Sequence, residues 1–105
     1  MFFNISGITD VALISPGGGF SNAKTIHIVN THASDPVLVD LYISTLSSGG
    51  SAASVYYILK SHYITSNEYF NLESDVLSFD NNSSTGHGLY IALNNTSSTV
   101  DVIIK

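Results

Sequence analysis

Residues 23–44 read Ala-Lys-Thr-Ile-His-Ile-Val-Asn-Thr-His-Ala-Ser-Asp-Pro-Val-Leu-Val-Asp-Leu-Tyr-Ile-Ser, and this stretch decides the fold class. Apolar residues occupy every second position from Val37 to Ile43. Because the side chains of a strand alternate between its two faces, this spacing predicts a strand with one wholly apolar face. Residues 30–36 hold Asn, Ser, Asp and Pro, which favour a turn and allow Pro36 to begin a strand. We therefore predict two strands joined as a hairpin.

The rest of the chain predicts further short strands and no long helix. Residues 54–60 are rich in aromatic and β-branched types on both faces, so we expect both faces to be covered. Other strand candidates are residues 9–15, 63–65, 69–72, 76–79, 89–94 and 100–105. Residues 66–68 are a candidate cap for one short helical turn. About seven to nine short strands with frequent turns predict an all-β protein, an antiparallel β-sandwich of jelly-roll or Ig-like type.

The 105 residues are enough for one domain with one core, so we expect residues 1–105 to form a single β-sandwich domain. Its apolar start, with Phe2, Phe3 and Ile5, predicts that residues 1–8 form an N-terminal arm or an edge strand. This start lacks a basic region and is broken by polar residues, so we do not expect a signal peptide. No apolar run approaches the roughly 20 residues that span a bilayer, so we expect no membrane association.

Charged residues make up 10% of the chain, well below the roughly 25% of ordinary soluble domains. The net charge is −5, and the three lysines at positions 24, 60 and 105 are the only basic residues besides histidine. A nucleic-acid interface needs clustered cations, so this class is excluded. The absence of cysteine removes disulfides and thiolate chemistry. We interpret the low charge as a sign of a surface covered by partner chains, against the alternative of a solvated domain rich in Ser and Thr.

Candidate metal ligands do not form a recognisable motif. His27 and His32 lie five positions apart, which puts them on opposite faces of a regular strand. His32 and Asp35 share a turn and are the best local pair for a metal, although a turn histidine bonded to backbone or solvent is the commoner outcome. Residues 80–82 (Asp-Asn-Asn) are dense in oxygen ligands for calcium but lack the EF-hand spacing. We therefore predict no metal site and no cofactor.

Catalytic patterns are equally weak. Asp80, His87 and any of several serines have the residue types of a hydrolase triad. No Gly-x-Ser-x-Gly elbow is present to support such a triad. Glu73 and Asp75 share a strand face, but a chain of this size has little room for the cleft of a glycosidase. The glycines at 17–19 are not followed by Gly-Lys-Ser or Gly-Lys-Thr, so they do not form a phosphate loop. We predict no catalytic residues and no enzyme.

Tyrosine is the residue type best suited to an interface here, because it has an apolar body and a polar tip. Burial in cross-strand pairs is the commoner fate of such residues. The predicted interface positions are Phe2, Phe3, Ile5, Tyr42, Tyr56 and Tyr90. If residues 1–6 form an arm, their deletion should weaken assembly and leave the fold intact.

Five segments taken in order carry a resemblance. They are Thr-Asp-Val-Ala-Leu-Ile-Ser-Pro-Gly at 9–17, Lys-Thr-Ile-His-Ile-Val-Asn-Thr at 24–31, Val-Leu-Val-Asp-Leu-Tyr-Ile at 37–43, Gly-Leu-Tyr-Ile-Ala at 88–92 and Val-Asp-Val-Ile-Ile at 100–104. In this order they resemble small all-β virion proteins of tailed bacteriophages, which are β-sandwiches found among head, neck and tail genes. Residues 20–22 and 83–88 depart from the pattern in two loops.

The resemblance implies a virion structural protein, and above all a capsid decoration or cement protein that binds the lattice of the major capsid protein. It would be made in the host cytoplasm and reside on the capsid surface as a homo-oligomer, with a trimer favoured. A head–neck or tail connector, or a fibre-attachment protein, is the alternative within this class. A carbohydrate-binding module or adhesin domain that uses the tyrosines and residues 80–87 is the alternative of another class.

Overall fold

The computed structural model describes residues 2–17, 25–45, 55–73, 87–95 and 97–105. These ranges hold eight strands: β1 (Phe2–Ser6), β2 (Thr9–Ile14), β3 (Thr25–Asn30), β4 (Val37–Ser44), β5 (Val55–Ile64), β6 (Tyr69–Glu73), β7 (Gly88–Leu93) and β8 (Thr99–Ile104). No helix long and apolar enough to cross a membrane occurs within them.

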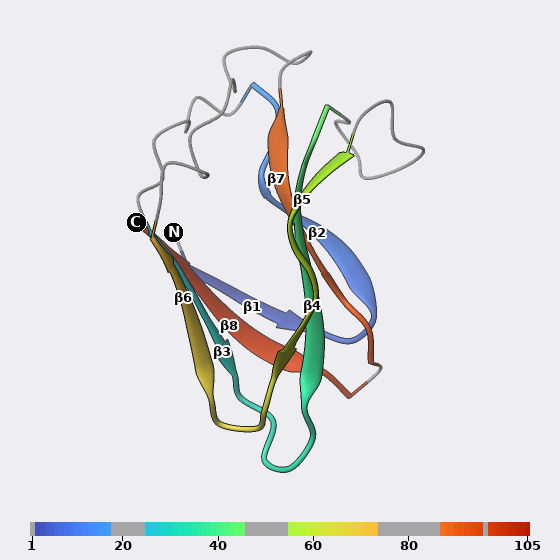
Figure 1. Cartoon of the computed structure of the whole chain (residues 1–105), viewed down its shortest axis with the longest axis vertical. Coiled ribbons are helices and arrows are strands. Elements are labelled where there is room, and N and C mark those ends of the chain that lie inside the picture. The colour runs from blue at the N-terminus through green and yellow to red at the C-terminus, as the bar shows by residue number, and fades with distance from the viewer. Residues whose placement is uncertain (1, 18–24, 46–54, 74–86, 96) are drawn as a thin grey trace.

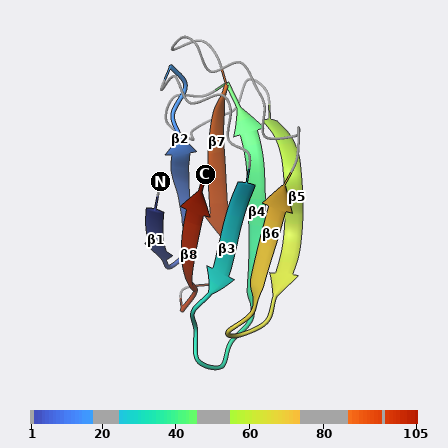
Figure 2. The same ribbon diagram turned by 90° about the vertical axis from the view of Figure 1, so that its left-hand side faces the viewer.

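The strands form two four-stranded sheets that face one another (Figures 1 and 2). Sheet A has the order β1-β8-β3-β6 and sheet B the order β2-β7-β4-β5, and every pairing is antiparallel. In sheet A, β1 pairs with β8 and β3 pairs with β6, whereas in sheet B, β2 pairs with β7 and β4 pairs with β5. Strands from the two ends of the chain therefore pair with each other, from the outermost pair to the innermost. A long hairpin rolled up in this way is a jelly roll. The predicted antiparallel β-sandwich is confirmed, and of its two predicted types the strand order is the jelly roll.

The alternation of apolar residues produces the core. Along β3 and β8 every second side chain is buried, and Ile26, Ile28, Val100 and Val102 face inward from sheet A. From sheet B, β4 and β7 contribute Val37, Val39, Leu41, Leu89 and Ile91. Burial of such residues is the main favourable term in folding, at about 25 cal/mol per Å² of apolar surface.

The predicted hairpin of β3 and β4 is wrong. The two strands lie in different sheets, and residues 31–36 carry the chain from one sheet to the other. Asn30, at the end of β3, is fully buried, and its side chain bonds the backbone at Asp35 and Ile64. Alternation reports which face of a strand is buried but not which strand lies beside it, so the strands were predicted and their pairing was not.

Strand β5 differs from the sequence prediction in its length and in the exposure of its side chains, because its two faces are not both covered. It runs from 55 to 64 as one edge strand of sheet B, and the predicted helical turn at 66–68 is instead a reverse turn in which Asn67 has φ 61°. Strand β5 has ten residues and its partner β4 has eight, because the register between them shifts at two points. At one of them the Asp40 carboxylate accepts a hydrogen bond from the Ser61 amide at 2.6 Å, and Ser61 has φ 52°. Such bulges bend a strand.

The N-terminal segment is an edge strand of sheet A. All five residues of β1 pair with β8, and Ile5 is buried in the core. Deletion of residues 1–6 would remove part of the core, so the structure leads us to expect that this deletion destabilises the fold. The predicted strand at 76–79, the candidate calcium ligands at 80–82 and Asp75 lie outside the described residues.

Candidate protein–protein interface

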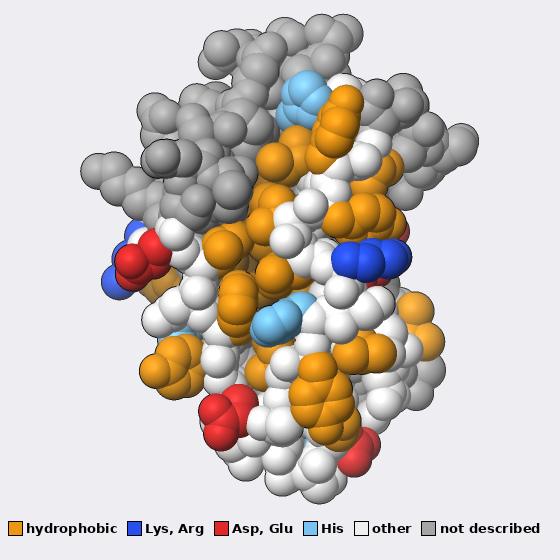
Figure 3. Space-filling model, viewed as in Figure 1, with side chains coloured by type: hydrophobic (Ala, Val, Ile, Leu, Met, Phe, Trp, Pro, Cys, Tyr) orange, Lys and Arg blue, Asp and Glu red, His pale blue; other side chains and the backbone are white. Residues whose placement is uncertain are grey.

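Strand β5 is an edge strand that carries three exposed tyrosines. It lies at the edge of sheet B, next to β6 at the edge of sheet A, and the turn at residues 65–68 joins the two. Figure 3 looks onto this side of the molecule, where a strip of hydrophobic side chains runs between the two sheets. Partly buried residues that pack against the core from these two strands are Ile58, Leu59, Phe70 and Leu72. We call this side, together with Tyr56, Tyr57 and Tyr63, the β5 edge.

Large exposed apolar side chains are few among the described residues. The six are Phe2, Ile8, Tyr56, Tyr57, Tyr63 and Tyr69, with exposed fractions from 51% to 81%. Three of them belong to β5. Tyrosine at an interface supplies a large, stiff contact area, so the concentration of three in one edge strand marks this strand as a contact surface.

A row of tyrosines on the outer face of sheet B holds one of these residues in place. Tyr90 of β7, Tyr42 of β4 and Tyr57 of β5 face one another across paired strands. The rings of Tyr42 and Tyr90 are stacked with centroids 5.4 Å apart, and the rings of Tyr42 and Tyr57 are tilted at 5.6 Å. The row runs from the buried middle of the sheet to its exposed edge, so it fixes Tyr57 on a rigid support.

Charges around this row are paired with each other. The Lys60 ammonium lies 4.4 Å above the ring of Tyr57 and 3.4 Å from the Asp40 carboxylate. Asp40, together with the hydroxyl of Tyr57, raises the pKa of Lys60. Lysines on edge strands commonly prevent unwanted strand addition. Here Lys60 lies over the ring of Tyr57 and does not guard the free edge of β5. The two bulges of β5 limit strand addition instead.

Burial sets the protonation of the two inner tyrosines. The Tyr42 hydroxyl donates to an Asp10 carboxylate oxygen at 3.2 Å. Burial and the nearby Asp10 charge raise the pKa of Tyr42 to about 12. Burial also raises the pKa of Tyr90, whose hydroxyl has no hydrogen-bond partner among the described residues.

The structure separates the six predicted interface positions into two groups. Ile5, Tyr42 and Tyr90 are buried within the single chain, so their side chains do not present an exposed contact surface in this structure. Phe2 and Tyr56 are exposed, and Phe3 is partly buried against the core. Tyr57 and Tyr63 are tyrosines that were not among the six predicted positions, and both are exposed on the edge strand β5.

The histidines do not converge. His32 Nδ1 accepts hydrogen bonds from the amides of Ser34 and Asp35 at 3.1 and 2.9 Å, and its Nε2 lies 3.7 Å from the Asp35 carboxylate. This histidine therefore organises the turn, with one ring nitrogen committed to the backbone. Within the described ranges, no three His, Asp or Glu residues are grouped so that they can hold a metal ion.

The remaining three histidines lie beside aromatic or amide groups on other strands. His62 of β5 packs against Phe70 of β6 with ring centroids 4.4 Å apart, which links the edges of the two sheets. His87 lies 6.1 Å from Tyr56. His27 bonds Asn71 on the outer face of sheet A.

Comparison with known proteins adds information on the fold. No family model and no curated protein sequence matches the chain. The solved structure of PirA is similar over all of this chain and 92% of that chain, with TM-score 0.50 and 16% identity. The similarity to the Yersinia pseudotuberculosis-derived mitogen extends over all of this chain and 81% of the mitogen chain, with TM-score 0.45 and 16% identity. The similarity to the Anabaena sensory rhodopsin transducer extends over 96% of this chain and 95% of the transducer chain, with TM-score 0.44 and 13% identity. At 16% identity, the likeness to PirA is one of fold alone. The strand order of this chain is that of a jelly-roll β-sandwich.

Proposed function

We propose that the chain is a virion structural protein of a tailed phage, a capsid decoration or cement protein that contacts the major capsid protein through the β5 edge. The observation that carries the proposal is that Tyr56, Tyr57 and Tyr63 are all exposed on one edge strand beside partly buried apolar residues. A few aromatic residues often supply much of the binding free energy in protein interfaces. The resemblance of the sequence to small phage virion proteins supports the same class.

The charge content of the chain agrees with an assembly role. A protein whose surface is covered by neighbouring subunits needs few charged residues to prevent association. Charged residues are 10% of this chain. The charged pair of Lys60 and Asp40 lies beside the tyrosines and is satisfied within the chain. The partner can therefore cover this surface without leaving an unpaired charge buried, which is the costly case.

The contact is made by side chains more than by strand addition. An incoming strand needs a regular row of free amides and carbonyls, and the two bulges interrupt that row along β5. Side chains that project from a bent edge instead fit pockets or grooves of a partner. A head–neck or tail connector would use the same surface, and the place on the particle decides between the two roles.

Association as a homo-oligomer, with a trimer favoured, follows from the many-copy role. Closed symmetry is the usual way in which identical chains cover apolar surface, and such an oligomer presents several β5 edges to a lattice at once. Several weak contacts then act together, so the whole oligomer binds more tightly than one chain.

The proposal is tested by binding to capsids assembled from the major capsid protein of the same phage. The double variant Tyr56→Ser and Tyr63→Ser removes two exposed rings without touching the Tyr42 row. We expect at least a tenfold loss of affinity in co-sedimentation, since the loss of one aromatic hot spot costs about 2 kcal/mol or more. Ile8→Ser is the matched control, because Ile8 is exposed and apolar but lies outside the β5 edge. Equal binding by all three folded proteins would contradict the proposal.

A further inference from the structure

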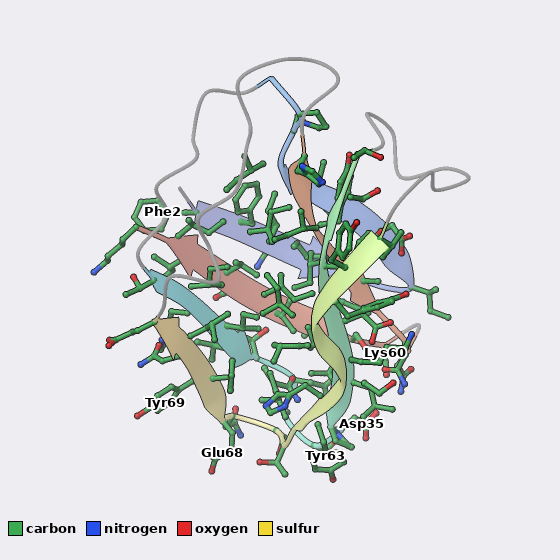
Figure 4. All side chains as sticks on the ribbon, turned by 45° about the horizontal axis from the view of Figure 1, so that its top comes forward. Phe2, Asp35, Lys60, Tyr63, Glu68 and Tyr69 are labelled. Carbon is green, nitrogen blue, oxygen red and sulfur yellow. The ribbon has the colours of Figure 1, made fainter. Side chains whose placement is uncertain are left out.

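The outer face of sheet A is a second surface with a different chemistry. The register brings Phe2, Ile103, His27 and Asn71 into one row across all four strands. Side chains of this row point away from the core, since their neighbours Phe3, Val102, Ile28 and Phe70 form the inward row. This face lies away from the three tyrosines of the β5 edge, as the places of Phe2 and Tyr69 against Tyr63 and Lys60 show in Figure 4.

Two adjoining hollows lie on this face. The larger has a volume of about 450 Å³ and is lined by Thr25, His27, Asn71, Glu73, Ile103 and Lys105. The smaller has a volume of about 280 Å³ and shares Ile103 with the first, and Phe2, Asn4 and Asp101 line its other parts. The larger falls in the size range of small-molecule sites, and the two hollows, which share Ile103, together make one strip of surface.

Among the described residues, the larger hollow combines a mainly apolar surface with several polar groups, and its two charged side chains have opposite signs. One hydroxyl, one amide and one imidazole lie beside Glu73 and Lys105, whose charges are opposite, and Ile103 is the apolar element. An apolar ligand would leave these polar groups buried without partners. A phosphate or other strong anion would need an excess of cations, and the second hollow adds the carboxylate of Asp101. The ligand that fits is neutral and carries many hydroxyl groups together with apolar C–H surface.

Several of these polar groups are already held in place. His27 and Asn71 are hydrogen-bonded to each other, and Asn4 donates to the Asp101 carboxylate at 2.6 Å. Side chains fixed in this way lose little entropy when a ligand binds. Each amide or carboxylate in these pairs keeps further lone pairs or N–H groups for a ligand.

Exposed aromatic rings flank the strip at both ends. Phe2 stands at the β1 end with an exposed fraction of 81%, and Tyr69 stands at the β6 end with 62%. The ring of Tyr69 lies 5.1 Å from the imidazole of His27, which links this ring to the larger hollow. An aromatic face of this kind can pack against the C–H face of a sugar ring while nearby amides and carboxylates bond its hydroxyl groups.

We propose that the outer face of sheet A binds a neutral saccharide, with His27, Asn71 and Glu73 bonding its hydroxyl groups and Tyr69 packing against a ring. The site is independent of the β5 edge. A virion protein that holds the capsid through β5 can therefore present sheet A to glycans outside the particle.

The test is binding of the whole chain to an array of immobilised neutral and acidic oligosaccharides, followed by titration calorimetry with the best neutral one. We expect a dissociation constant of about 1 mM or tighter, and at least a tenfold loss of affinity in Asn71→Ala and in Tyr69→Ala. Glu73→Gln serves as a milder third variant, because it keeps the size of the side chain, and we expect it to weaken binding as well. Tyr63→Ala is the matched control, since it removes an equally exposed tyrosine from the other surface.

Three results would overturn the proposal. The first is an array on which the folded wild-type chain binds no neutral saccharide. The second is binding to acidic oligosaccharides only. The third is a neutral saccharide whose affinity falls in Tyr63→Ala and is unchanged in the three sheet A variants. Thermal melting of each variant shows that a loss of binding is not a loss of fold.

Discussion

The buried side-chain amide of Asn30 donates a hydrogen bond to the backbone carbonyl oxygen of Ile64 at 3.0 Å. Asn30 ends a strand of sheet A and Ile64 ends a strand of sheet B, so this bond ties the two sheets together at one end of the sandwich. The same amide nitrogen donates to the carbonyl of Asp35, and the amide oxygen accepts from the backbone of His32. A polar residue in the core is thereby fully satisfied.

Replacing Asn30 by Ala should lower the free energy of unfolding by about 3 kcal/mol, because two carbonyls and one amide lose their buried partner. Urea denaturation measures this change. The control is Asn4→Ala, where the lost bond to Asp101 is exposed and the expected change is below about 1 kcal/mol. Equal losses in the two variants would contradict the role assigned to Asn30.

Gly88 marks a close approach between β7 and the end of β2. A Cβ atom at this position would lie 2.6 Å from the carbonyl oxygen of Ile14 and 2.7 Å from Cδ of Pro16. Gly88→Ala should therefore destabilise the fold by about 1–3 kcal/mol, and Gly88→Val by more. Thermal or urea unfolding of this graded pair provides the measurement. If alanine left the stability unchanged, the contact with Ile14 and Pro16 would not be as tight as described.

The raised pKa of Tyr42, about 12, predicts a stability change at high pH. The folded state keeps the Tyr42 proton above pH 10, where the tyrosine of the unfolded chain begins to lose it. The contribution of Tyr42 is thus complete below pH 10 and is lost as the pH rises towards 12. The free energy of unfolding of the wild-type chain should fall more steeply over this range than that of Tyr42→Phe. Parallel pH profiles of the two proteins would show that Tyr42 titrates alike in both states.

The proposed homo-oligomer predicts a defined sedimentation coefficient. Sedimentation velocity of the isolated chain should show a closed species, with a trimer favoured, that is the same with calcium and with a chelator. A monomer at all concentrations would contradict the homo-oligomer. A monomer that changes only when calcium is added would favour a ligand-binding module of the calcium-dependent kind.

The sequence predicts the strands well because apolar alternation is a local property. It does not predict that β3 and β4 lie in different sheets, because strand pairing depends on contacts between residues far apart in the sequence, of which the bond between Asn30 and Ile64, 34 positions apart, is one example. Tyr42 and Tyr57 have similar sequence surroundings, yet one is buried and the other exposed. The difference arises from their places in a central and an edge strand, which only the fold defines. The hollows of sheet A likewise depend on a row that crosses four strands.

The measurement that tests the central claim most directly is quantitative mass spectrometry of intact particles, purified by density gradient, of the phage that we propose encodes the chain. A capsid decoration or cement protein is predicted to be present in many copies, at a fixed ratio to the major capsid protein that persists through repeated purification. Complete absence of the chain from intact particles that contain all other structural proteins would contradict the account.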